Sequence, residues 1–187
     1  MDDALVAEIE ADVWAWMREF VAVRNDFYGG KFAPCPFAQR ALTIGTVDVA
    51  VWREGNAREF VRAQAAGMRD TPALTTRVMT FPPRVQLTWG FSDFVDSVNA
   101  ELVPDNVFIN PGIAKHTRSK YPGSAGHPYF MVVANSLDAV LTGSQVLQRS
   151  DYYDNWPASH FEIVVERRAR LARRYARQEV PSSPDPS

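Results

Sequence analysis

The single cysteine of this chain, Cys35, is the first side chain whose type and setting could support chemistry. Pro34 and Pro36 flank it and restrict the local backbone, so that the thiol is confined to a narrow range of positions. A thiol held in this way can act as a metal ligand or as a nucleophile. The alternative is a buried cysteine that packs as a small hydrophobic side chain, because no His or Lys is adjacent in sequence to activate it.

A second set of candidates lies in residues 110–128, which we predict to be a long loop because they contain three prolines and three glycines. This loop has no Asp or Glu, and its Arg118 and Lys120 could therefore hold a carboxylate or a phosphate. His116 and His127 could ligate a metal or a haem iron. The alternative is a solvated loop whose histidines lie on the surface.

The third feature is a run of arginines on a helix that we expect over 157–178. Five of them are predicted to face mostly outward: Arg167, Arg170, Arg173, Arg174 and Arg177. Such a face can bind nucleic acid or a membrane. It can equally be solvated and paired with acids, which the N-terminal helix supplies, and we favour this second interpretation.

These candidates belong to an ordinary globular chain of 187 residues, which predicts one domain over 1–178 and a disordered tail over 179–187. Its 20 basic and 22 acidic residues give a net charge of −2, which argues against a dedicated nucleic-acid partner. No apolar run reaches the ~18 residues of a membrane span, and the acidic N-terminus does not resemble a signal peptide. One cysteine excludes an internal disulfide, so we expect a cytoplasmic protein.

The elements that must position these side chains alternate between helices and short strands. Hydrophobic periodicity predicts helices over 3–24, 57–69, 92–102 and 157–178. It predicts strands over 43–52, 74–81, 106–110 and 130–134, and leaves 136–147 undecided between helix and irregular structure. This order predicts an α+β fold, with a single small sheet of about four strands covered by helices and with long N- and C-terminal helices.

The stretch from Phe32 to Ala38, which reads Phe-Ala-Pro-Cys-Pro-Phe-Ala, resembles the motif of bacterial proteins of the YqcI/YcgG type and of related smaller families. Asn110-Pro111, and Arg118 to Lys120 before the apolar strand, resemble a second segment of that group, and Asp138 falls where the group tends to place an Asp. The order of elements agrees over about 30–140.

Some members of that group are haem proteins that oxygenate nitrogen, so the resemblance implies a haem-dependent oxygenase that acts on a small amino-acid-like substrate. It would use His127 or His116 as the iron ligand, Cys35 as a thiolate alternative, and Arg118 and Lys120 as anion contacts. Many relatives have His-Pro after the second strand, whereas this chain has Thr80 to Pro83 there, reading Thr-Phe-Pro-Pro. The alternatives are a cofactor-free enzyme with Cys35 as its nucleophile and a non-catalytic protein that binds a small anion; a homodimer is possible in each case.

Overall fold

The computed structural model describes residues 1–83, 85, 90–113 and 129–175. Its centre is one mixed sheet in the order β1-β2-β4-β3, in which β1 and β2 are parallel and the other neighbours are antiparallel. The strands are β1 (Val47–Val51), β2 (Thr76–Phe81), β3 (Val107–Ile113) and β4 (Phe130–Ser136). The predicted α+β fold with one small sheet is confirmed.

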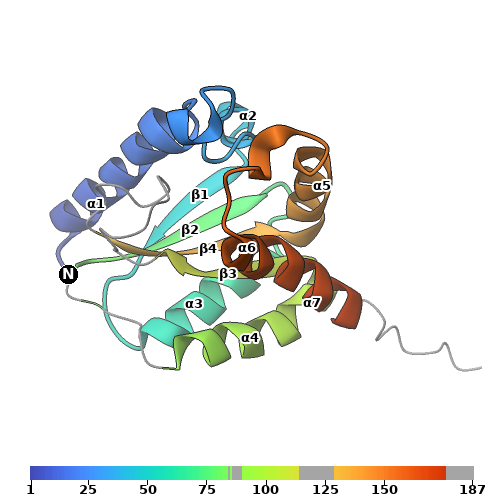
Figure 1. Ribbon diagram of the computed structural model, residues 1–187. Helices are drawn as coiled ribbons and strands as arrows, with labels where there is room; N and C mark the ends of the chain where they lie inside the picture. Colours follow the sequence, from blue (N-terminus) through green and yellow to red (C-terminus); the bar gives the residue numbers. More distant parts are fainter. Residues whose placement is uncertain (84, 86–89, 114–128, 176–187) are drawn as a thin grey trace, which may run out of the picture.

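Helices lie on both faces of this sheet, with α1 on one face and α3 and α4 on the other, while α5, α6 and α7 gather at one end (Figure 1). Their bounds are α1 (Asp3–Trp16), α2 (Ala38–Ile44), α3 (Ala57–Ala66), α4 (Phe91–Leu102), α5 (Leu137–Leu147), α6 (Ala158–Phe161) and α7 (Arg167–Tyr175). No helix in the described ranges is long and apolar enough to cross a membrane.

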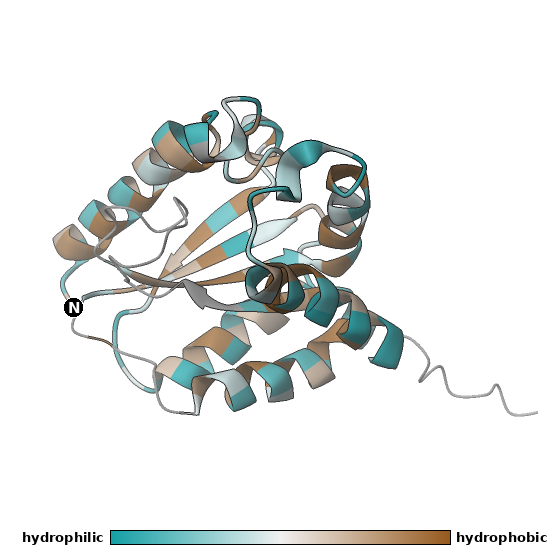
Figure 2. Cartoon of the chain, in the orientation of Figure 1, coloured by the Kyte–Doolittle hydropathy of each residue, from teal (hydrophilic) through white to brown (hydrophobic). Residues whose placement is uncertain are grey.

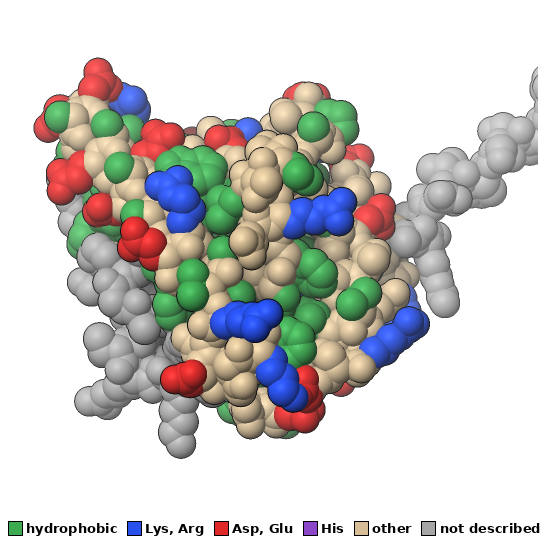
Figure 3. Space-filling model, turned by 90° about the horizontal axis from the view of Figure 1, so that it is seen from above, with side chains coloured by type: hydrophobic (Ala, Val, Ile, Leu, Met, Phe, Trp, Pro, Cys, Tyr) green, Lys and Arg blue, Asp and Glu red, His purple; other side chains and the backbone are tan. Residues whose placement is uncertain are grey.

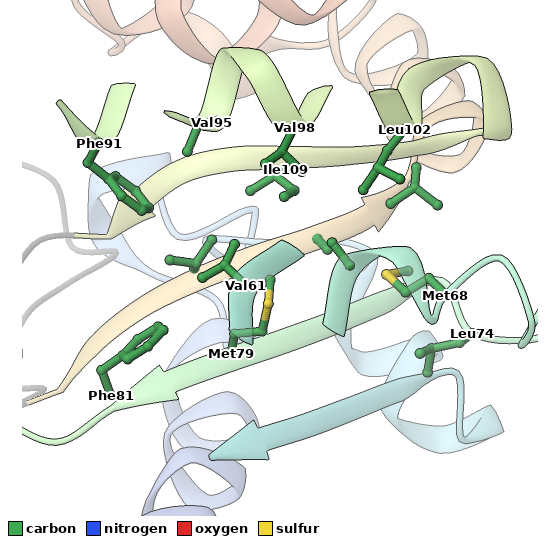
Figure 4. Packing of buried hydrophobic residues seen from close by; sticks show 14 residues of the cluster. Val61, Met68, Leu74, Met79, Phe81, Phe91, Val95, Val98, Leu102 and Ile109 are labelled. Atoms are coloured by element: carbon green, nitrogen blue, oxygen red, sulfur yellow. The ribbon is translucent and has the colours of Figure 1, made fainter. Parts of the chain in front are cut away.

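Alternation along the strands explains why both faces are covered. Val78 of β2 faces α1, whereas its neighbours Met79 and Phe81 face α3 and α4. Because successive strand residues point to opposite faces, a strand that is apolar on both faces needs a helical layer on each side. Figure 2 shows strands that carry apolar segments among a few polar ones, between helices with mixed surfaces, and Figure 4 shows the packing of the larger core around Met79 and Phe81.

Asn99 of α4 closes the free edge of the sheet beside β3. Its side-chain amide donates to the carbonyl of Ile109 over 3.0 Å, and its side-chain oxygen accepts from the N–H of Ile109 over 2.8 Å. The Asn99 side chain has no exposed surface. One buried amide thus satisfies both backbone groups that an edge strand would otherwise leave unpaired.

Several element boundaries differ from those that the periodicity predicts. Thr43 and Ile44 belong to α2 rather than to a strand, and Gly45 (φ 72°) ends that helix before β1 begins. The first residues of α2 lie between the helix predicted over 3–24 and the strand predicted over 43–52, where the sequence analysis predicts no element. A seven-residue helix is too short to display a clear period, whereas the positive φ at Gly45 is a common end to a helix.

Other corrections concern the second half of the chain. Strand β3 continues to Ile113, so that the predicted loop over 110–128 begins later than expected. The undecided segment is helix α5, whose N-terminus is capped by the Ser136 hydroxyl. Helix α4 begins at Phe91 after Gly90, one residue before its predicted start.

Both long terminal helices contain a π-helical turn. The first turn, Met17–Val21, follows α1 directly, and the second, Glu162–Glu166, lies between α6 and α7. Such turns insert one extra residue into a helix and are often found at functional sites. The side chains and carbonyls around these two turns contribute to the site described below.

Candidate functional site

The Cys35 segment is held in place through its backbone. The N–H of Cys35 donates to the carbonyl of Val21 over 3.0 Å, and the N–H of Ala38 donates to the carbonyl of Cys35 over 3.0 Å. Val21 is the last residue of the first π-helical turn, where its carbonyl accepts a bond from outside the helix. The irregular end of the N-terminal helix therefore anchors the segment that carries the thiol.

An aromatic cluster fixes the same segment from the other side. The ring of Tyr152 stacks on Tyr28 with 4.8 Å between centroids, and it meets the edge of Phe32 at 5.6 Å. Its hydroxyl donates to the carbonyl of Pro34 over 2.5 Å. Burial raises the pKa of Tyr152, and Tyr28 raises it further, so this hydroxyl stays protonated as a donor.

The thiol itself is a neutral group in these surroundings. Cys35 is an exposed residue, but desolvation of the thiol by the neighbouring protein raises its pKa. The backbone N–H groups of Phe37 and Ala38 act in the opposite direction and do not cancel that effect. The structure therefore gives Cys35 no activated thiolate, and its role as a nucleophile or iron ligand stays a prediction.

Arg168 of α7 lies in the interior and lacks a counter-charge. Its exposed fraction is 6%, and the atom Nη2 donates to the hydroxyl of Ser144 on α5. The atom Nε is buried and has no hydrogen-bond partner. No carboxylate in the described part of the chain forms an ion pair with this guanidinium.

Tyr153 connects this guanidinium to the Cys35 segment. Burial is the main influence on Tyr153 and raises the pKa of its phenol, and Cys35 acts in the same direction. A hydrogen bond from Ser144 and the positive charge of Arg168 lower that pKa. Both Arg168 and Cys35 are thus within electrostatic range of one phenol. Burial lowers the pKa of Arg168, and Tyr153 opposes that effect, which marks a guanidinium short of negative charge.

Helix α5 also contacts the Cys35 segment through a close approach at Gly143. A Cβ atom at Gly143 would lie 2.8 Å from the Cε2 atom of Phe37, so a larger residue here would require the exposed Phe37 ring to move. Phe37 is two residues after Cys35, and Gly143 precedes Ser144. Four separate segments therefore meet here: the Cys35 segment, α5, the turn Asp151–Tyr153 and α7.

Tyr153 also forms part of the lining of a shallow surface depression. The lining consists of three aromatic rings, three acids and two small residues, namely Tyr153, Asp154, Trp156, Ala158, Ser159, Phe161, Glu162 and Glu166. Glu162 raises the pKa of Glu166 through a hydrogen bond between the two carboxyls. The depression is open to solvent beside the buried cluster.

Sequence analysis and structure agree only in part on the site. Cys35 lies within the cluster, whereas His116, Arg118, Lys120 and His127 lie outside the described residues. Within the described ranges, no group of three or more His, Cys, Asp or Glu side chains could hold a metal ion.

Sequence reasoning missed Arg168, Ser144 and Tyr153. One signal was present, because Arg168 lies between Val165 and Ala172 at spacings of three and four residues, and all three are buried. An arginine in the apolar stripe of a helix is worth noting, since charged residues are almost never fully buried without a partner.

Comparison of this chain with protein-family models, with curated proteins and with solved structures finds no match.

Proposed function

We propose that this protein binds a small carboxylate-bearing molecule at Arg168. The observation that carries the proposal is a guanidinium more than nine-tenths buried, whose Nε has no partner and whose Nη2 contacts only the Ser144 hydroxyl. The adjacent Nε and Nη2 atoms form the edge of a guanidinium that matches the two oxygens of a carboxylate. The hydroxyls of Ser144 and Tyr153 can donate to the same anion.

The energetic argument is that a lone buried charge is expensive. Removing an ion from water costs several kcal/mol, and a good counter-charge is needed to offset that cost. Ser144 supplies a single neutral acceptor, and burial already lowers the pKa of Arg168. A residue that destabilises the ligand-free protein is expected where it serves binding, because functional sites commonly trade stability for activity.

Two variants and a control test the proposal. Titration calorimetry with acetate, benzoate and inorganic phosphate would compare the parent protein with Arg168→Met, Arg168→Lys and, as the control, the exposed Arg173→Met on the same helix. We expect a carboxylate to bind the parent protein and the Arg173 variant, with at least about tenfold loss in Arg168→Lys and no binding in Arg168→Met.

The melting temperature of the ligand-free variants separates a binding role from a structural one. Replacing an unpaired buried charge by an apolar side chain of similar volume is often neutral or stabilising. We therefore expect Arg168→Met to melt at the parent temperature or above it. A marked fall in melting temperature, together with no carboxylate binding by the parent protein, would show that Arg168 is a structural residue and would refute the proposal.

Haem-dependent oxygenation, implied by the sequence resemblance, is a separate proposal. Its candidate iron ligands His116 and His127 and its anion contacts Arg118 and Lys120 lie outside the described residues, and burial raises the pKa of the remaining candidate, Cys35. The absorption spectrum of protein expressed with a haem precursor tests it directly. A Soret band that shifts in His127→Ala or His116→Ala would support a histidine ligand, and a colourless protein would remove the proposal.

A further inference from the structure

Helix α7 presents more positive charge than the described residues around it neutralise. Four of its arginines line one shallow depression, which is formed by Asp96, Arg167, Arg170, Leu171, Arg173 and Arg174. Arg167 pairs with Asp96, and Arg170 pairs with Glu162 over 2.6 Å. Arg173 and Arg174 are exposed and form no ion pair with a residue that the structure describes.

The N-terminal helix carries the opposite charge. Besides Asp3, which pairs with Arg53, four acids are exposed on α1 and on the π-helical turn that follows it, namely Glu8, Glu10, Asp12 and Glu19. Asp12 accepts a hydrogen bond from Tyr129 over 2.7 Å, but none of the four forms an ion pair within the described part of the chain. Acidic side chains gather on the side of the molecule where α1 lies (Figure 3).

These two helices do not meet within one molecule. Helix α1 packs on one face of the sheet, whereas α7 packs against α4 and α5 near the opposite end of the fold (Figure 1). The sequence-based expectation that the N-terminal acids pair with the C-terminal arginines is therefore wrong for the described residues. The acidic and basic surfaces remain on the outside, where they can meet only between molecules.

We propose that two copies of this chain associate, with α7 of each copy against α1 of the other. Charge complementarity favours a second copy as the partner, because one chain carries both the acidic surface of α1 and the basic surface of α7. In a closed pair, each acidic surface contacts the basic surface of the other copy. Glu8 and Asp12 lie one helical turn apart on α1, and Arg170 and Arg174 lie one turn apart on α7, so each pair of charges repeats at about 6 Å along its helix. Leu171 supplies an apolar contact within the basic depression.

Salt dependence is the first property that follows from this proposal. The charges involved are exposed, so ions in solution screen their attraction strongly as the salt concentration rises. Sedimentation equilibrium at about 50 mM and about 500 mM salt should show a dimer whose dissociation constant rises by at least about tenfold. A protein that stays monomeric at low salt and high concentration would overturn the proposal.

Charge reversal tests which surfaces are involved. We expect Arg173→Glu/Arg174→Glu to be monomeric, and likewise Glu8→Lys/Glu19→Lys, while an equimolar mixture of the two variants associates again. The control Arg149→Glu reverses the charge of an exposed arginine outside α1, its π-helical turn and α7, and it should dimerise like the parent protein. Circular dichroism verifies that each variant is folded.

Two further results would count against this pair of surfaces. Dimers that persist in the α7 variant would place the interface elsewhere, and species larger than a dimer would indicate an open head-to-tail contact instead of a closed pair. A single-stranded oligonucleotide added to the parent protein provides the last comparison. If it binds through Arg173 and Arg174 while the protein stays monomeric, then α7 serves a polyanion and the proposed dimer is wrong.

Discussion

Replacing Asn99 by Leu should destabilise this protein more than most single substitutions would. Leu keeps a similar volume but removes the amide that bonds both backbone groups of Ile109, at 3.0 Å and 2.8 Å. Both groups would then be buried without partners, because Asn99 and Ile109 have no exposed surface. Each unsatisfied group costs roughly 1–3 kcal/mol, so the free energy of unfolding should fall by about 2–6 kcal/mol.

Urea denaturation measures this loss, and differential scanning calorimetry should show a melting temperature lower by at least about 5 °C. The matched control is Ser97→Ala on the same helix, whose exposed hydroxyl donates to the carbonyl of Phe94 over 2.7 Å. That change should cost less than about 0.5 kcal/mol. If the two variants lost equal stability, Asn99 would not be sealing the edge of the sheet and the argument from buried hydrogen bonds would fail.

Three further predictions concern the site and the pH dependence of stability. Iodoacetamide should label native Cys35 slowly at neutral pH, because burial raises the pKa of the thiol; fast labelling followed by mass spectrometry would contradict this. Gly143→Ala should lower the melting temperature, since its Cβ would lie 2.8 Å from the Phe37 ring, and Phe37→Ala should reduce that effect; additive changes would argue against the contact. Burial, reinforced by Asp12, raises the pKa of Tyr129 from 10.0 to about 12, so the stability that this protonated phenol contributes is complete below pH 10 and is lost between pH 10 and 12. Tyr129→Phe should flatten that part of the stability curve, and an unchanged curve would refute the assignment.

The architecture could be predicted because it depends on local periodicity. The alternation along Val47–Val51, the short run with buried residues at its end in Thr76–Phe81, and the apolar stripes of α1, α3 and α4 all appear within short windows of sequence. The ends of helices and strands were harder to predict from the sequence where tertiary contacts decide the local structure. Helix α2, for example, is a short helix packed between the π-helical turn and α5, and no window of its own sequence specifies that position.

Of the residues in the candidate cluster, the sequence singles out only Cys35, whose neighbouring prolines are visible, and its role stays a prediction. Ser144, Tyr153 and Arg168 belong to three different elements, and nothing in their spacing indicates that one phenol connects them. The cationic loop attracted attention because it lacks acids over a long stretch. Arg168 did not, because an arginine among many on one helix resembles a solvated residue until the packing of that helix is known.

The π-helical turn Glu162–Glu166 determines which residue of α7 faces the interior. The wider turn takes up one extra residue, so the residues after it face as they would in a regular helix that is one residue shorter. If the same residues were wound as a regular α-helix, at about 100° per residue, α7 would be rotated and Arg168 would turn away from Ser144. Deleting one residue from this turn should therefore restore a regular helix and leave Arg168 beside Ser144, whereas a deletion in the regular part of the helix ahead of Arg168 would rotate the guanidinium away.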